Sequence, residues 1–335
     1  WLEECQNHEN CPPQIEVPLP TRVIKIPDTP GTNPSLWTTC GISGKYVALS
    51  HCWGRSVPVS TTLDTFEAFE REIILTNLPK SFRDAIDITQ RLGFMYLWID
   101  SLCIIQDSAQ DWASECSMMA LVYTNATLVI GAAAAADSSQ GFLIPRNFLQ
   151  GPTLNHASGY FLREKIISRI DQTTSPLSSR AWAYQEALLA PRLLLYTSSQ
   201  MSWECRHGIK DEGVNVVVSS NNSCSKKQFY RTIDSPLPSV CNRFNTWYAC
   251  VEDYSLRQLS HASDKLPALS GLAVAIHDPT MGEYLAGIWS GDLATGLFWA
   301  RHIAREEIYN RAFTKCRDYR APSWSWASCE GPLNF

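Results

Sequence analysis

Charged residues are scarce in this 335-residue chain, and the positively charged ones do not cluster in any segment of the sequence. Only 18% of the residues are charged against 45% hydrophobic, and the net charge is −5 at pH 7. No stretch is rich in Lys and Arg, so the electrostatic footprint of a nucleic-acid-binding protein is absent. The high apolar content predicts a globular chain with a well-buried core.

Long hydrophobic runs are also missing. The longest apolar stretch lies around Leu128 to Ala136, and a membrane-spanning helix needs roughly 18 residues. No signal-peptide pattern opens the sequence either. We therefore expect no contact with a membrane and a cytoplasmic location.

Several signatures of common enzymes are absent. The sequence has no Walker loop, no HExxH, no GxSxG and no GxGxxG after a strand. Ordinary nucleotide hydrolysis, zinc proteolysis and hydride transfer on a Rossmann domain therefore have no support. A nucleophilic pair of His51 with Cys52 or Cys103 is disfavoured as well. Cys103 lies among apolar residues, and side chains adjacent on a strand seldom meet.

Cysteine, by contrast, is plentiful. The chain has twelve, but a protein of this size does not need disulfide staples. Cys103, Cys116 and Cys250 fall inside strong strand or helix patterns, where a reduced thiol behaves as a small buried hydrophobe. We therefore expect a reducing compartment.

The segment CQNHENC places three soft metal ligands, Cys5, His8 and Cys11, at regular spacing. Tetrahedral zinc needs a fourth ligand, and no adjacent residue supplies one. Cys40 or Cys52 could reach back, but nothing in the sequence indicates that either does. We expect no metal site here and interpret the segment as a terminal arm packed on the domain, with zinc binding as the alternative.

The middle of the chain alternates between strand and helix patterns. Apolar runs of strand length occur at 46–50, 94–99, 127–133 and 192–197, and helical patterns lie between them at 78–93, 111–126 and 181–190. This rhythm predicts an α/β fold, a doubly wound and mostly parallel sheet with right-handed crossovers.

Composition divides the chain into three regions. Residues 1–45 are rich in Pro, Asn and Thr and predict an extended arm with one strand at 22–26. Residues 46–206 form the predicted α/β core. Residues 207–335 predict a mainly helical subdomain packed on that core, with an irregular polar start at 207–240, helix and loop in YLAGIWSGDLATGLFWAR, and strand in the last 15 residues.

Ligands of doubly wound sheets bind beyond the carboxyl ends of the strands, near a switch in strand order. That rule singles out Ser50, His51, Trp53, Asp100 and the segment 132–140.

Several long motifs resemble those of one known family. The chain closely resembles the fungal HET domain, named for heterokaryon incompatibility, in the stretches ALSHCWG, YLWIDSLCIIQDSAQDWASECSMMALVYTNATLVIGA, LSSRAWAYQEALLAPRLLLYTSSQMSWEC, DKLPALSGLA and the late RAPSWSWAS. The resemblance runs in the right order over nearly the whole chain. It implies non-self recognition and programmed cell death, and a flavodoxin-like fold remotely related to TIR domains.

Some TIR domains cleave NAD with one essential glutamate in a WCxxE-like helix start. The stretch AWAYQE is similar, with Trp182 followed by Glu186, although Ala183 stands where TIR domains often have Cys. The resemblance therefore implies Glu186 as the catalytic residue of an NAD glycohydrolase that requires no cofactor and takes NAD as its substrate.

Cleavage of the nicotinamide–ribose bond passes through an oxocarbenium-like state, which one carboxylate in a dry cleft can stabilise. Asp100 and His51 join Glu186 as candidate catalytic residues, Asp100 by binding a ribose hydroxyl or by orienting His51. The candidate binding residues are Ser50, Trp53, Gly54, Arg180, Trp182 and Gln185. The tryptophans would stack on a flat ring, Ser50 and Gly54 would face phosphates, and Arg180 would clamp an anion.

Structural roles are the alternative for each of these residues. Glu186 would pair with Arg180 or Arg192, the two tryptophans would be core, and His51 would be hydrogen-bonded beneath the sheet. Asp100 would cap a turn, and Arg180 would bind a carbonyl group or Asp107. At the level of function, the alternatives are a signalling module that works by self-association or partner binding, and a tailoring enzyme acting on small molecules.

Overall fold

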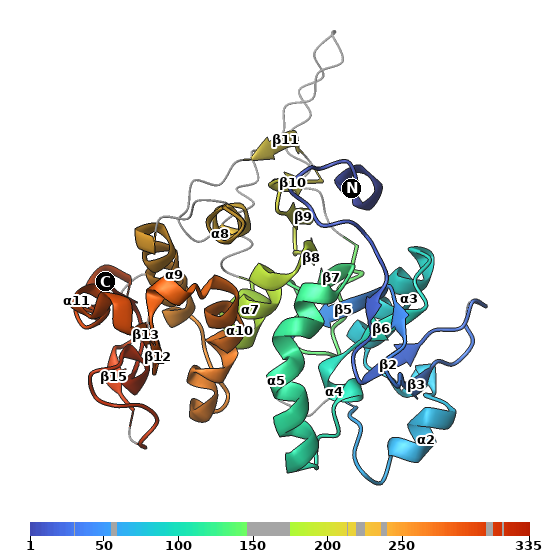
Figure 1. Ribbon diagram of the computed structural model, residues 1–335. Helices are drawn as coiled ribbons and strands as arrows, with labels where there is room; N and C mark the ends of the chain where they lie inside the picture. Colours follow the sequence, from blue (N-terminus) through green and yellow to red (C-terminus); the bar gives the residue numbers. More distant parts are fainter. Residues whose placement is uncertain are drawn as a thin grey trace.

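A nine-stranded sheet forms the centre of the protein in a computed structural model that describes residues 1–29, 31–54, 59–145, 175–212, 214–218, 225–235, 240–305, 311–316 and 318–335. The strand order is β11-β10-β9-β8-β7-β5-β6-β2-β3. Figure 1 shows the sheet beside a group of helices from the second half of the chain, with α5 and α7 between them. The strands of the sheet are β2 (Arg22–Lys25), β3 (Ser35–Thr38), β5 (Tyr46–Ser50), β6 (Tyr96–Trp98), β7 (Leu128–Gly131), β8 (Arg192–Tyr196), β9 (Met201–Cys205), β10 (Ile209–Asp211) and β11 (Val214–Val218).

The four central strands β8, β7, β5 and β6 are parallel to one another. The chain passes from β5 to its neighbour β6 and then returns past β5 to reach β7. The direction of winding therefore reverses between β5 and β7, where Ser50 stands opposite Gly131. The α/β fold with a parallel centre is thus confirmed.

Antiparallel strands extend the sheet on both sides of this centre. Residues before the α/β core supply β2, where a strand is predicted, and β3, where none is. On the other side, β9, β10 and β11 follow β8 as successive antiparallel strands. Short connections allow such pairing without a crossover helix.

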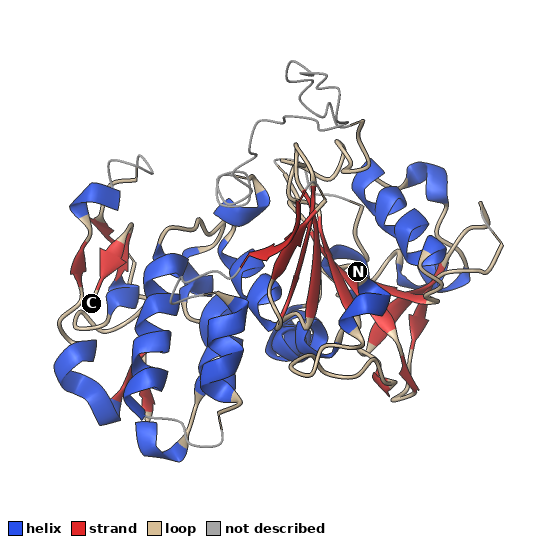
Figure 2. Cartoon of the chain, turned by 90° about the horizontal axis from the view of Figure 1, so that it is seen from above, coloured by secondary structure: helices blue, strands red, loops and turns tan. Residues whose placement is uncertain are grey.

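Helices cover both faces of the sheet (Figure 2). Apolar residues of α3 are buried, and α5, α7 and α10 pack on one another. This double cover explains why the central strands are continuous apolar runs, all five residues of β5 being buried. The helices are α1 (Leu2–Cys5), α2 (Phe66–Arg71), α3 (Lys80–Arg91), α4 (Asp100–Cys103), α5 (Ala109–Asn125), α7 (Ala181–Leu189), α8 (Lys226–Ile233), α9 (Val240–Ser255), α10 (Pro267–Ile276) and α11 (Leu293–Gly296).

The helix α7 lies between two apolar clusters, one around the sheet and one among the later helices. Seven of its nine residues are buried, so both of its sides are covered. It ends before Pro191, because a proline disfavours helical geometry in the residue ahead of it. Burial on all sides accounts for the absence of a polar face in AWAYQEALL.

The second apolar cluster is built largely from α8, α9, α10 and the tail, and it buries Trp247, Trp289 and Trp326. Among the described residues, four two-stranded pairings accompany the main sheet: β1 (Val17–Pro18) with β4 (Ser43–Gly44), β12 (Tyr284–Leu285) with β13 (Ile288–Trp289), β14 (Ala300–Arg301) with β17 (Leu333–Asn334), and β15 (Thr314–Lys315) with β16 (Cys329–Glu330). β16 and β17 lie in the last 15 residues, for which strand is predicted, but each has only two residues.

Two secondary-structure predictions for this region were wrong. The stretch 207–240 contains β10, β11 and α8 where an irregular segment is predicted. The stretch YLAGIW opens with the hairpin β12–β13, and its turn residues Ala286 and Gly287 have φ values of 44° and 99°. Positive φ at both central positions matches the twist of a two-residue hairpin. The apolar composition of the stretch does not predict this hairpin. Among the described helices, none has the length and apolar character needed to cross a membrane.

Candidate functional site

A cleft of about 830 Å³ opens at the carboxyl ends of β5 and β6. Residues that follow these strands line it, namely Cys52, Trp53, Gly54 and Asp100, together with Arg180, Trp182 and Glu186 from the start of α7 and its first turns. The facing wall comes from the segment between α9 and α10 and includes Gln258, His261 and Asp264. The structure therefore brings six of the nine sequence-predicted site residues to one cleft.

Glu186 lies at the floor of this cleft and is only 2% exposed. The Ser50 hydroxyl donates a hydrogen bond to its Oε2 atom. Burial raises the pKa of Glu186 to about 7, against the opposing effects of Arg180 and of the Ser50 hydrogen bond. The Tyr123 hydroxyl also acts to lower this pKa, and Asp100 to raise it. The carboxyl group can therefore be ionised or neutral near neutral pH.

The two arginines considered as partners of Glu186 are engaged elsewhere. Arg180 donates a hydrogen bond to the carbonyl oxygen of His51, and Arg192 donates to the carbonyl oxygen of Pro12. Within the described part of the chain, Glu186 forms no ion pair with either arginine. Arg180 still lies on the cleft wall, close enough to influence the carboxyl electrostatically.

Two hydrogen bonds hold the side chain of Asp100, which lies just beyond the carboxyl end of β6. The Trp53 Nε1–H group donates to its Oδ2 atom over 2.8 Å, and the backbone N–H of Ser101 donates to Oδ1 over 2.7 Å. The ring of His51 lies behind it, with Nδ1 3.8 Å from Asp100 Oδ1. Burial lowers the pKa of His51 to about 4 although Asp100 acts to raise it. His51 is therefore neutral at physiological pH, and it faces Asp100 from inside the protein.

The remaining predicted residues divide between the cleft and the packing around it. Trp182 is half-buried, lines the cleft and donates from Nε1 to Asp264 Oδ2 over 3.1 Å. Gly54 has a φ of 88°, and a Cβ there would lie 2.2 Å from Asp137 Cβ, so only glycine fits. Gln185 points away from the cleft, where its Oε1 accepts a hydrogen bond from the backbone N–H of Gly271 at 2.7 Å.

The two cysteines near His51 are unsuited to nucleophilic chemistry. Burial raises the pKa of Cys52 to about 11 and that of Cys103 to about 12. A thiol with such a pKa forms almost no thiolate at neutral pH. These raised pKa values agree with the sequence argument against a Cys–His nucleophile.

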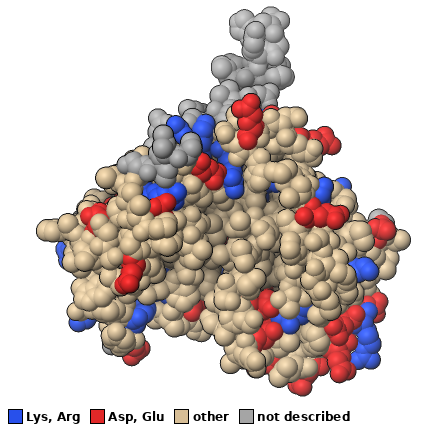
Figure 3. Space-filling view, in the orientation of Figure 1, with Lys and Arg blue, Asp and Glu red and all other residues tan. Residues whose placement is uncertain are grey.

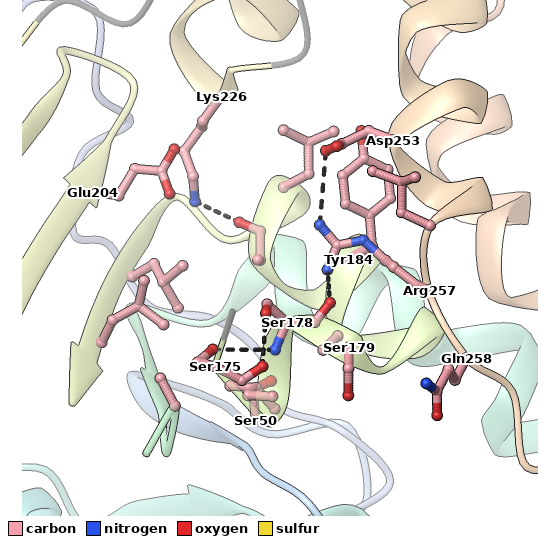
Figure 4. Close-up of a pocket in the computed structure, with 18 of the residues that line it drawn as sticks. Ser50, Ser175, Ser178, Ser179, Tyr184, Glu204, Lys226, Asp253, Arg257 and Gln258 are labelled. Carbon is pink, nitrogen blue, oxygen red and sulfur yellow. Dashed lines mark hydrogen bonds and ion pairs between the residues drawn. The ribbon is translucent and has the colours of Figure 1, made fainter. Parts of the chain in front are cut away.

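A smaller cavity of about 400 Å³ lies on the other side of Ser50 (Figure 4). Figure 4 shows Lys226 and Glu204 on one side of it and Arg257 on the other. The Lys226 Nζ group donates to the carbonyl oxygen of Ala187 over 2.6 Å, and burial lowers its pKa to about 8. The hydrogen bond between Ser50 and Glu186 thus separates two hollows.

Sequence reasoning missed the wall that Gln258, His261 and Asp264 contribute. Asp264 opens DKLPALSGLA, one of the motifs that carry the family resemblance, so a signal was present. Nothing in the sequence links it to the strand ends, because the contact joins segments about 80 residues apart.

The segment CQNHENC also gains a partner in the structure. Cys5, His8 and Cys11 converge with Cys205, and their ligand atoms lie within 4.8 Å of one another. The fourth residue is therefore Cys205, from the end of β9, and neither Cys40 nor Cys52. The described cysteines are all free thiols.

The charges on the surface are mixed. Figure 3 shows Lys and Arg side chains scattered among Asp and Glu over the face that it draws. On that face, cationic side chains form no continuous patch of the kind that binds a nucleic-acid backbone.

Comparison with known proteins gives one match. Residues 46–186 match the family described as heterokaryon incompatibility protein (HET). Searches of curated proteins and of solved structures gave no match. The matched stretch begins with β5 and ends at Glu186, so it contains every residue predicted for catalysis or ligand binding. The part of this chain that is similar to a known family is therefore residues 46–186, which match the heterokaryon incompatibility (HET) family.

Proposed function

We propose that this protein hydrolyses the nicotinamide–ribose bond of NAD in the cleft above Glu186, and that the reaction serves a heterokaryon incompatibility response that ends in cell death. One observation carries the proposal. A buried carboxyl with a raised pKa forms the floor of a cleft of about 830 Å³ at the ends of parallel strands. Perturbed carboxyl groups in pockets of this size are typical of active sites.

The order of the parallel strands supports a flavodoxin-like, TIR-related interpretation of the fold. Taken in chain order, β5, β6, β7 and β8 are the first to fourth parallel strands, and they stand side by side as 2-1-3-4. Doubly wound sheets of this order bind ligands where the first and third strands part. Ser50, the hydrogen-bond partner of Glu186, is the last residue of the first of these strands.

Hydrolysis of the nicotinamide–ribose bond requires little from the protein beyond one negative charge close to the ribose. The bond between ribose C1′ and the nicotinamide nitrogen breaks with its electron pair going to the nitrogen, so nicotinamide leaves as a neutral molecule. Water attacks C1′ and loses a proton to solvent, which gives ADP-ribose. The ionised Glu186 would stabilise the positive charge that develops on the ribose or would hold its hydroxyl groups.

The other cleft residues have matching roles in this proposal. Trp53 and Trp182 would flank the nicotinamide ring and exclude water. Asp100, fixed by two hydrogen bonds, would accept from a ribose hydroxyl. Arg180 would face a phosphate, and its positive charge also favours the ionised form of Glu186.

Nicotinamide release from NAD by the purified protein tests the proposal. We expect turnover by the wild type and a loss of about 100-fold or more in Glu186→Gln, which keeps the shape of the side chain and removes its charge. Glu115→Gln is the matched control, because Glu115 is also a buried glutamate but pairs with Arg22 away from the cleft. We expect that control to retain turnover.

Two outcomes would contradict the proposal. One is turnover by Glu186→Gln at the rate of the wild type. The other is no nicotinamide release by the wild type even at high protein concentration, where self-association is favoured, which would leave a signalling module that works by assembly.

A further inference from the structure

Four potential metal ligands from two distant parts of the chain meet beside the N-terminus. They are Cys5, His8, Cys11 and Cys205. The Nδ1 atom of His8 lies 3.5 Å from Cys205 Sγ and 3.8 Å from Cys11 Sγ. Around one tetrahedral zinc ion with ordinary bond lengths, a sulfur and a nitrogen ligand are about 3.6 Å apart. These separations are compatible with coordination of a single ion.

Local backbone geometry accounts for the convergence of the first three ligands. The N–H of His8 donates to the carbonyl oxygen of Cys5 over 3.2 Å, and the N–H of Cys11 donates to that of His8 over 3.1 Å. Two successive turns of this kind bring every third residue to the same side. The regular spacing of the ligands in CQNHENC thus becomes one face of a compact loop.

The fourth ligand comes from a hairpin of the main sheet. Cys205 is the last residue of β9, and it exchanges two backbone hydrogen bonds with Gly208 that close the turn into β10, at 3.0 and 3.2 Å. Its position is therefore fixed by the sheet and does not depend on the N-terminal segment.

Other contacts hold the N-terminal segment against this hairpin. Lys210 forms an ion pair of 2.8 Å with Glu4. The ring of His207 stacks on that of His8 with the centroids 4.3 Å apart and the planes inclined by 21°. These contacts hold the two segments together and keep the four potential ligands beside one another.

The ligand types determine which metal fits. Three thiolates and one imidazole form a soft, tetrahedral set that zinc prefers, whereas calcium and magnesium need oxygen ligands. Cys5 and Cys205 are buried, and His8 and Cys11 are half-buried. Four protein ligands leave no coordination position for a water molecule, which is the pattern of a structural site and not of a catalytic one.

We propose that Cys5, His8, Cys11 and Cys205 bind one Zn²⁺ ion that fastens the N-terminal segment to the β9–β10 hairpin. The ion closes a long loop between Cys11 and Cys205, so its binding opposes unfolding. The site lies outside the matched family region and is independent of the proposed NAD chemistry. Neighbouring Glu204 lines the smaller cavity, so the ion also steadies the strand that carries this residue.

Metal analysis of the full chain, purified without an affinity tag that binds metals, tests this proposal. We expect about one zinc per chain in the wild type. Cys205→Ser should lose most of the zinc, while Cys241→Ser should keep it, because Cys241 is an exposed thiol of α9. His8→Cys, which preserves a tetrahedral set, should also keep the zinc. This variant distinguishes loss of a ligand from general damage to the fold.

A spectroscopic measurement covers the case in which Cys205→Ser fails to fold. Replacement of zinc by Co²⁺ in the wild type should give intense visible d–d bands and thiolate-to-cobalt charge transfer, the signature of tetrahedral thiolate ligation. Absence of bound zinc together with absence of this spectrum would overturn the proposal. So would a disulfide between two of the three cysteines in the freshly purified protein, or zinc content that Cys205→Ser leaves unchanged.

Discussion

At the scale of the residue, the protein keeps a carboxyl group where its charged form is costly. Glu186 is 2% exposed, and one hydroxyl, that of Ser50, donates directly to it among the described hydrogen bonds. A glutamate that only stabilised the fold would normally have a close cationic partner, because an unpaired buried charge is unfavourable. Arg180 instead binds a carbonyl oxygen and leaves the carboxyl group facing the cleft. The catalytic role proposed for Glu186 would account for this arrangement, because function can retain a residue at some expense of stability.

The raised pKa of Glu186 predicts how stability changes with pH. In the unfolded chain the carboxyl group has a pKa near 4.5, and in the folded protein a pKa of about 7. The stability gained by burying the neutral form is complete below the lower value and is lost as the pH rises through the higher one. The loss approaches about 3 kcal/mol near pH 8, as an upper bound.

Glu186→Gln removes this titration. We expect the variant and the wild type to melt at similar temperatures near pH 5, and the variant to melt at a higher temperature near pH 8. Thermal unfolding followed by circular dichroism at both pH values checks this, and comparison of the two proteins cancels the titration of His51. An equal difference in melting temperature at both values would show that Glu186 ionises normally.

At the scale of the element, α7 is the part of the fold on which the candidate site depends. It packs on α5 and α10, and its Gln185 accepts a hydrogen bond from the backbone of Gly271 in α10. That contact requires close approach of the helices, since a Cβ at Gly271 would lie 2.3 Å from Ala120 Cβ and 2.6 Å from Gln185 Oε1. The glycine is therefore a packing requirement, although glycine lowers helix propensity.

Gly271→Ala should separate α10 from α5 and α7. We expect a net destabilisation of about 1–3 kcal/mol, because the overlap outweighs the gain in helix propensity. Urea unfolding measures this change, and Val274→Ala in the same helix, where the valine is 78% exposed, should be close to neutral. Equal or greater stability of Gly271→Ala would show that the helices are less tightly packed than the structure indicates.

The predictions from sequence succeeded where an element has a periodic pattern of its own. The strands β5 to β8 and the helices α3, α5 and α7 lie where the apolar patterns place them. The strands β9, β10 and β11 were missed, because hairpins added to a sheet edge have mixed burial, as in the partly exposed β10. Gln185 was expected in the cleft. On a helix that is buried on all sides, the sequence does not indicate which residues face the cleft and which face the neighbouring helices.

Contacts between distant segments were beyond the reach of the sequence. Cys5, His8 and Cys11 were noted as potential ligands at regular spacing, although no metal site was expected there. Cys205 joins them only through the folding of the sheet. The same holds for Asp264, which the fold brings to Trp182. Residue patterns thus indicated one wall of the cleft and three of the four proposed metal ligands, and the tertiary structure supplied the remainder.

At the scale of the whole molecule, the cleft belongs to two regions of the chain. The HET match ends at Glu186, whereas Gln258, His261 and Asp264 of the facing wall lie well beyond it. A β-bridge between Arg180 and Gln258 and the hydrogen bond from Trp182 to Asp264 join the two regions across the site. A ligand in the cleft would therefore contact both regions, because the segment between α9 and α10 forms the facing wall.

The structure of the Glu186→Gln variant crystallised with NAD is the most direct test of this account, because the variant should bind the substrate without consuming it. We predict the nicotinamide ribose within hydrogen-bonding distance of residue 186, with the ring between Trp53 and Trp182. NAD bound in the smaller cavity beside Lys226, or a cleft that stays empty at saturating NAD, would contradict it.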